Sequence, residues 1–73
     1  MTKKEEVNKI VSDYLKVDNV TPESHLVDDL GADPFDTIEV VIKVEQGLGV
    51  KIPQDVGDNI KTVQDLIDAV KGN

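Results

Sequence analysis

β-Branched residues crowd the centre of this chain, and the residues at the two ends of that segment decide whether it forms a strand or a helix. Asp33 is a favourable N-cap residue, and Pro34 suits the first helical position, where its missing N–H would have no partner anyway. Gly47 and Gly49 supply a stop signal at the other end. These flanks predict a helix over residues 34–48.

A second helix is predicted near the N-terminus, over about residues 3–16. Thr2 and Glu5 have the spacing of a capping box, in which each side chain accepts a hydrogen bond from a free backbone N–H. The apolar residues behind it recur at helical spacing: Val7, Ile10, Val11, Tyr14 and Leu15. This pattern is typical of a helix with one face in a core.

A long connection over residues 17–33 follows the first helix. Residues 21–24 read Thr-Pro-Glu-Ser, which predicts a turn. Leu26, Val27 and Leu30 are expected to anchor the connection to the core.

The C-terminal third predicts two more helices. Pro53 and Gly57 leave room for only one short helix, at about residues 55–60. The last helix opens at Thr62 and should close near Gly72. Its apolar residues fall on one side: Val63, Leu66, Ile67 and Val70.

The length of 73 residues allows one small domain, residues 1–73, and no second. Only Tyr14 and Phe35 are aromatic, so the core must be built from Val, Ile and Leu. The absence of cysteine excludes disulfides and thiolate metal sites. The prediction is therefore an all-α bundle of three main helices and one short helix, with a long first loop.

The charge is strongly acidic, because 15 Asp and Glu residues face eight Lys for a net charge of −7. Seven of these acids, and no lysine, lie between Val17 and Ile42. Nucleic-acid binding is excluded because it needs cationic contacts to phosphates. Membrane insertion is excluded because no apolar run approaches the roughly 18 residues of a membrane span. A basic protein surface is the natural partner, although the same charge could serve only to keep a small domain soluble.

The predicted central helix has more apolar surface than a core requires. One arc of it contains Thr37, Val40, Val41, Val44 and Leu48. A second arc contains Phe35, Ile38 and Ile42, with Glu39 and Glu45 beside it. A bundle could bury both arcs, but the flanking acids favour a second arc that faces a partner.

The sequence from Leu30 to Glu39, Leu-Gly-Ala-Asp-Pro-Phe-Asp-Thr-Ile-Glu, resembles the signature of acyl carrier proteins. That family carries Leu-Gly-Ala-Asp-Ser-Leu-Asp-Thr, then an apolar residue and Glu. The resemblance extends over nearly the whole chain, through Val20–Ser24, Val27–Leu30, Ile52–Pro53 and Ile60–Asp65. It implies the acyl-carrier-protein fold and a place in fatty-acid, lipid or polyketide synthesis.

One position departs from the family, and it is the functional one. The family's serine receives 4′-phosphopantetheine, whose thiol carries the acyl chain, but here that position is Pro34. Proline has no hydroxyl, so no attachment residue and no cofactor are expected. Thr37 lies one helical turn away, and Ser12 and Ser24 belong to other segments, so none of them is expected to substitute.

The resemblance also implies a partner surface, which would meet basic patches on synthase, transferase and activating enzymes. Its predicted members are the acids Asp36, Glu39 and Glu45 and the apolar residues Phe35, Ile38 and Ile42. Gln46 and Gly47 stand where the family often has two more acids. Lys43 could pair with Glu39 four residues earlier, which would weaken the grip of a basic partner.

A calcium-loop spacing and a single histidine are also present, but neither predicts a metal or catalytic site. Asp28 and Glu39 stand at the first and twelfth positions of a possible calcium loop, but Leu30, Ala32 and Asp33 occupy positions where that loop needs oxygen ligands and a glycine. His25 is the only histidine, and we expect it to be structural or solvent-facing. No residue is therefore predicted to be catalytic or to bind a metal.

We expect a cytoplasmic protein, since its N-terminus lacks an apolar stretch of signal-peptide type. We also expect it to be a monomer and not itself an enzyme. The favoured hypothesis is a non-modified carrier homologue that docks on enzymes of acyl-thioester metabolism. The alternative is a working acyl carrier protein of fatty-acid or polyketide biosynthesis. It would be modified at an unexpected hydroxyl, or the sequence would be a variant of one with serine at position 34.

Overall fold

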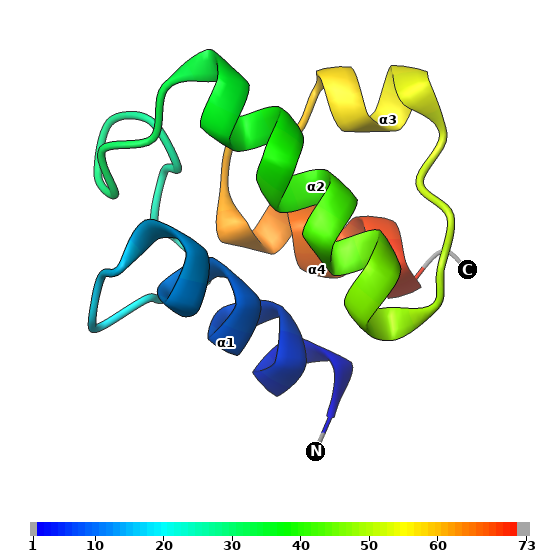
Figure 1. Cartoon of the computed structure of the whole chain (residues 1–73), viewed down its shortest axis with the longest axis horizontal. Helices are drawn as coiled ribbons and strands as arrows, with labels where there is room; N and C mark the ends of the chain where they lie inside the picture. The colour runs from blue at the N-terminus through cyan, green and yellow to red at the C-terminus, as the bar shows by residue number, and fades with distance from the viewer. Residues whose placement is uncertain (1, 72–73) are drawn as a thin grey trace.

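The computed structural model describes residues 2–71 and contains four helices in that part of the chain. They are α1 (Lys3–Leu15), α2 (Pro34–Leu48), α3 (Gln54–Asp58) and α4 (Val63–Lys71). Figure 1 shows α1 and α2 in front, α4 behind α2, and the short α3 alongside α2 at the upper right. The molecule is 18 Å thick along its shortest axis, which is room for two layers of helices about 10 Å across. The predicted all-α bundle with three main helices and one short helix is confirmed.

The capping box predicted at the start of α1 is present. Thr2 Oγ1 accepts a hydrogen bond from Glu5 N at 3.1 Å, and Glu5 Oε1 accepts one from Thr2 N at 3.1 Å. The helix ends at Leu15, one residue before the predicted end, because Lys16 adopts the left-handed conformation with φ 57°. Its N–H still donates to Ser12 O, which satisfies a terminal carbonyl.

The start of α2 is also as predicted, with Asp33 as N-cap and Pro34 in the first turn. Its end is set by Gly49, whose φ of 65° terminates the helix. The prediction that Gly47 also stops the helix is wrong, because Gly47 lies inside the last turn. A Cβ at Gly47 would lie 2.9 Å from Ile10 Cδ1, so this glycine allows α1 to approach α2 closely.

The first loop is tied to the beginning of α4 by backbone hydrogen bonds. Leu26 N donates to Lys61 O at 2.8 Å, and Val63 N donates to Ser24 O at 3.1 Å. These bonds carry Leu26 into the core, where it is fully buried. The anchoring role predicted for Val27 is wrong, since its side chain is 43% exposed on the outside of the turn that follows. Leu30 is half-buried against the core, as predicted.

The last two helices differ from the prediction only in their ends. α3 begins directly after Pro53 and is shifted towards the N-terminus relative to the predicted 55–60, because Asn59 caps it. Asp65 caps the start of α4, where its Oδ2 accepts from Lys61 N at 2.9 Å and from Thr62 N at 3.1 Å. These bonds, above all the one from Lys61, hold the pKa of the Asp65 carboxyl below its usual value. The stop predicted at Gly72 lies outside the described residues.

The core is aliphatic throughout, as the composition predicts. Its buried members are Val7, Val11, Leu26, Ala32, Val40, Val44, Ile52, Ile60, Val63, Leu66, Ile67 and Val70. Among residues 2–71 no polar or charged residue is fully buried. No helix in this part of the chain is long and apolar enough to cross a membrane.

Candidate functional site

The start of α2 presents two carboxylates and a proline to solvent. Asp33 Oδ1 accepts from Asp36 N at 2.7 Å, and Asp36 Oδ2 accepts from Asp33 N at 3.2 Å. Thr37 N donates to Asp33 O at 3.1 Å, so the first-turn donors are largely satisfied within the chain. Pro34 is exposed between these residues and offers neither a hydroxyl nor an N–H.

The six serine and threonine hydroxyls of the chain all take part in local hydrogen bonds. Thr37 Oγ1 donates to Asp33 O at 3.2 Å, a side-chain hydrogen bond back to the N-cap of α2. Ser12 Oγ donates to Val17 O at 2.6 Å, and Ser24 Oγ accepts from Thr21 N at 3.1 Å. Each serine and threonine hydroxyl therefore already has a hydrogen-bond partner within residues 2–71.

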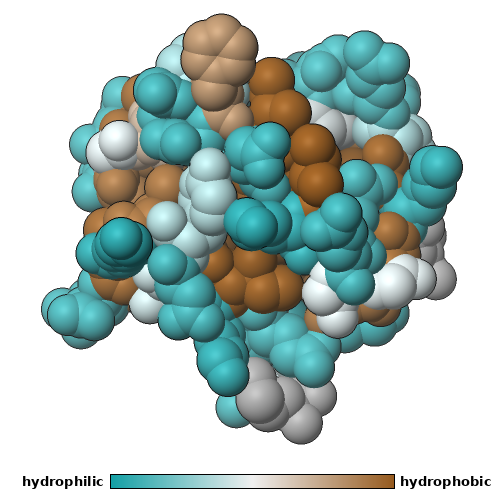
Figure 2. Space-filling view, in the orientation of Figure 1, coloured by the Kyte–Doolittle hydropathy of each residue, from teal (hydrophilic) through white to brown (hydrophobic). Residues whose placement is uncertain are grey.

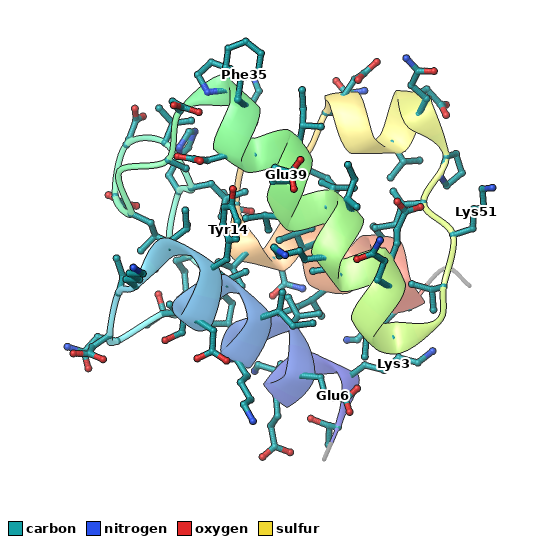
Figure 3. All side chains as sticks on the ribbon, viewed as in Figure 1. Lys3, Glu6, Tyr14, Phe35, Glu39 and Lys51 are labelled. Atoms are coloured by element: carbon teal, nitrogen blue, oxygen red, sulfur yellow. The ribbon has the colours of Figure 1, made fainter. Side chains whose placement is uncertain are left out.

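The outer face of α2, defined here by Phe35, Ile38 and Ile42, is exposed to solvent. Their side chains are 78%, 57% and 37% exposed, respectively. Figure 2 shows apolar residues along the front of α2 among hydrophilic neighbours, and Figure 3 shows the Phe35 ring standing clear of the helix. The prediction that the second arc faces outward is confirmed. Val40 and Val44, from the first arc, are fully buried.

The three predicted acids beside this face differ in their local partners. Asp36 is held in the capping box, and its Oδ1 is 3.5 Å from the Tyr14 hydroxyl. Glu45 Oε2 accepts from Ile52 N at 2.7 Å, which ties α2 to the segment that leads into α3. Glu39 is exposed, points away from the bundle in Figure 3 and has no hydrogen-bond partner among residues 2–71.

Lys43 is engaged differently from the prediction. Its ammonium lies 5.5 Å from the centroid of the Tyr14 ring, a cation–π arrangement between α2 and α1, and forms no ion pair with Glu39. Partial burial raises the pKa of the Tyr14 hydroxyl, and the negative charges of Asp36 and Glu39 raise it further. Sequence spacing carries no signal for this contact, because it joins residues far apart in the chain.

An open groove of about 260 Å³ separates the outer face of α2 from α3. Ile38, Ile42 and Glu45 line it from α2, while Ile52 and Gly57 line it from the other side. The groove continues the exposed apolar surface of Ile38 and Ile42, so the outer face includes a shallow depression as well as protruding side chains.

The setting of His25 is structural, as predicted. Its Nδ1 accepts from Asp28 N at 3.1 Å and lies 3.8 Å from Asp28 Oδ2. Its own backbone N–H donates to Asp29 Oδ2 at 2.7 Å, so the residue organises the turn after Ser24. Within residues 2–71, no cluster of three or more His, Cys, Asp or Glu side chains could hold a metal ion.

Comparison with known proteins points in one direction. The family model of the phosphopantetheine attachment site matches residues 5–70. An acyl carrier protein from Thermosynechococcus vestitus is 41% identical over 68 residues, which cover 90% of this chain and 84% of that protein. A solved structure from Mycobacterium tuberculosis, provisionally described as an acyl carrier protein, has a TM-score of 0.90 at 29% identity. That match covers 97% of both chains.

Proposed function

We propose a function from the premise that the chain belongs to the acyl carrier protein family. Members of this family are not themselves enzymes, and they interact with enzymes of acyl metabolism. Within that frame, the chain is a carrier homologue without phosphopantetheine. It acts in the cytoplasm as an interaction module that docks on enzymes of acyl-thioester metabolism.

Pro34 is the single observation that carries this proposal. The family attaches its cofactor through a phosphodiester to a serine oxygen, and Pro34 stands at that position without a hydroxyl. Proline is nevertheless well suited to the first turn of α2, since its φ is preset for a helix. The substitution therefore removes the chemistry and leaves the helix start intact.

The outer face of α2 supports the docking half of the proposal. Burying a protruding aromatic such as Phe35 in a partner's apolar pocket is worth about 1.5–3 kcal/mol. Glu39 lies beside the apolar residues, and its carboxylate has no ion-pair partner among residues 2–71, so it can pair with a lysine or arginine of a partner. An apolar anchor with an acidic surround fits a basic enzyme surface that has an apolar recess.

The first test measures the intact mass of the protein after incubation with coenzyme A, magnesium and a broad-specificity phosphopantetheinyl transferase. We expect no mass gain, while a serine-bearing carrier in the same tube is modified. The Pro34→Ser variant is the matched control, and we expect it to gain one phosphopantetheine. A gain by the unaltered protein would overturn the proposal.

The second test measures docking directly. The unmodified protein is titrated by calorimetry into a synthase and into a transferase that act on carrier-bound acyl thioesters. We expect saturable binding that weakens with salt, because the contact is partly ionic. Light scattering of the same sample tests whether the protein is a monomer. Absence of binding to every enzyme tried would contradict the docking role.

A second candidate function rests on the match of residues 5–70 to the phosphopantetheine attachment family. On this reading the protein is a working acyl carrier of fatty-acid or polyketide synthesis. It is either modified at another hydroxyl or is a variant of a sequence with serine at position 34. Peptide mapping after the transferase reaction separates the candidates. A modified Thr37, Ser12 or Ser24 would establish the second.

A further inference from the structure

The turn over residues 25–30, in the long loop that leads to α2, begins at the only histidine of the chain. His25 Nδ1 accepts a hydrogen bond from Asp28 N at 3.1 Å. The carbonyl of His25 accepts from Asp29 N at 2.8 Å and from Leu30 N at 3.1 Å. The imidazole therefore caps this turn in the way that a Ser, Thr, Asp or Asn side chain caps the start of a helix.

This cap depends on the charge of the ring. A ring nitrogen accepts an N–H through its lone pair, so the hydrogen bond requires neutral imidazole with its proton on Nε2. In the imidazolium form both nitrogens carry protons, and neither can accept. Histidine is the side chain that ordinarily changes charge between about pH 5 and 8. The His25 side chain is 32% exposed, so a proton can reach it from solvent.

A second acceptor is within reach of the protonated ring. Asp28 Oδ2 lies 3.8 Å from His25 Nδ1, so a small rotation of the ring allows a new Nδ1–H to donate to that carboxylate. The backbone need not follow, because His25 forms an antiparallel bridge with Thr62 and its own N–H donates to Asp29 Oδ2 at 2.7 Å. The ring can therefore move while the backbone of the turn stays in place.

The charges around His25 are mainly negative. The turn itself contributes the carboxylates of Asp28 and Asp29, and α4 contributes that of Asp65, which interacts electrostatically with His25. The segment that is hydrogen-bonded to the turn adds one lysine, Lys61. The carboxylates attract a proton to the ring, whereas the Asp28 N–H needs the nitrogen without one. The two arrangements of the ring are thus supported by different neighbours.

We propose that this turn is a pH-responsive element, in which protonation of His25 releases the Asp28 N–H and turns the imidazolium towards the Asp28 carboxylate. A proton from solvent adds to Nδ1, the Asp28 N–H passes to water, and the new Nδ1–H donates to Asp28 Oδ2. The exchange adds a positive charge to the stretch between Val17 and Ile42, where His25 is the only residue that can carry one. The inference does not rest on the proposed docking function.

The experiment is a titration of isotope-labelled protein from about pH 8 to 5, followed by amide and imidazole chemical shifts. We expect the Asp28 amide proton to move upfield with the same midpoint as the His25 ring nitrogens, because it loses its acceptor. Its protection against hydrogen exchange, corrected for the intrinsic pH dependence, should fall about fivefold. The Asp36 amide is the internal control, since the Asp33 carboxylate caps it at 2.7 Å. An Asp28 amide that keeps its shift and protection over this range would overturn the proposal, whether or not the ring titrates.

A matched variant separates the cap from the charge. His25→Asn keeps a side-chain acceptor for Asp28 N, because Asn is a favourable cap residue, but it does not titrate. We expect its Asp28 amide to stay protected and to keep one shift from about pH 8 to 5. His25→Ala has no acceptor and should lose the protection throughout this range. A pH response of Asp28 in His25→Asn equal to that of the unaltered protein would assign the response to another group and contradict the proposal.

Discussion

The two faces of α2 differ in their surroundings rather than in their chemistry. Val40 and Val44 on the inner face are fully buried, whereas Phe35 and Ile38 on the outer face are 78% and 57% exposed. Each Å² of apolar area left in water forgoes about 25 cal/mol of stabilisation. The inner face is therefore explained by folding. The outer face contributes little to folding, and the docking role proposed above would account for its exposed apolar residues.

The largest expected effect comes from placing the same charge on each face in turn. Val44→Asp puts a carboxylate among aliphatic side chains with no cation to pair with, a change that costs more than about 4 kcal/mol. The whole domain is expected to be stable by only about 4–11 kcal/mol, so this variant should be largely or wholly unfolded. Ile38→Asp should change the free energy of unfolding by less than about 1 kcal/mol.

Urea unfolding followed by circular dichroism measures both variants. Comparable destabilisation by the two aspartates would show that the outer face is as important for folding as the inner one. The distinction between the faces would then fail, and with it the argument that the outer face is kept for binding.

The next largest effect concerns partner affinity. Phe35→Ala should weaken binding to a synthase or transferase by about 1.5–3 kcal/mol, which is more than tenfold, because it removes the most exposed apolar anchor. Its free energy of unfolding should change by less than about 0.5 kcal/mol. Calorimetric titration gives the affinity, and urea unfolding gives the stability. Val56→Ala is the control, since Val56 is exposed at 39% but belongs to α3.

Local signals in the sequence were sufficient for the helices. The Thr2 and Asp33 caps, the position of Pro34 and the stop at Gly49 are short-range features, and each appears in the structure where it was predicted. Gly47 is the exception, because a glycine in the last helical turn has the same local pattern as a stop. A larger residue at this position would clash with the Ile10 side chain of α1, and no local sequence pattern reveals that contact.

The candidate site was predictable only in part, for the same reason. Periodicity placed Phe35, Ile38 and Ile42 on one side of a helix, but the outward direction depended on what α1 and α4 cover. The partner of Lys43 was predicted from helical spacing as Glu39 and is instead the Tyr14 ring on another helix. Contacts between distant segments are the part that sequence reasoning missed.

A smaller effect is expected at Asp33, the N-cap of the helix that carries both faces. Asp33→Ala removes the acceptor for Asp36 N and should lower the free energy of unfolding by about 1 kcal/mol. Affinity for the partner, corrected for the folded fraction, should hardly change. Asp18→Ala is the matched control. Asp18 is an exposed aspartate, so its replacement removes the same charge without removing a helix cap. Equal stabilities of the two variants would show that the cap contributes nothing.

The smallest effect distinguishes the acids of the outer face from one another. Glu39 has no hydrogen-bond or ion-pair partner among residues 2–71, whereas Glu45 Oε2 already accepts a 2.7 Å hydrogen bond from Ile52 N. Glu39→Gln should therefore weaken partner binding by about 1.4- to fivefold, in line with an exposed ion pair of about 0.2–1 kcal/mol. Glu45→Gln should change affinity less, because that carboxylate is oriented towards the chain itself. Titrations at low and high salt test this order. The loss from Glu39→Gln should fade as salt is added, and a larger loss from Glu45→Gln would place the basic partner over the α2–α3 groove instead.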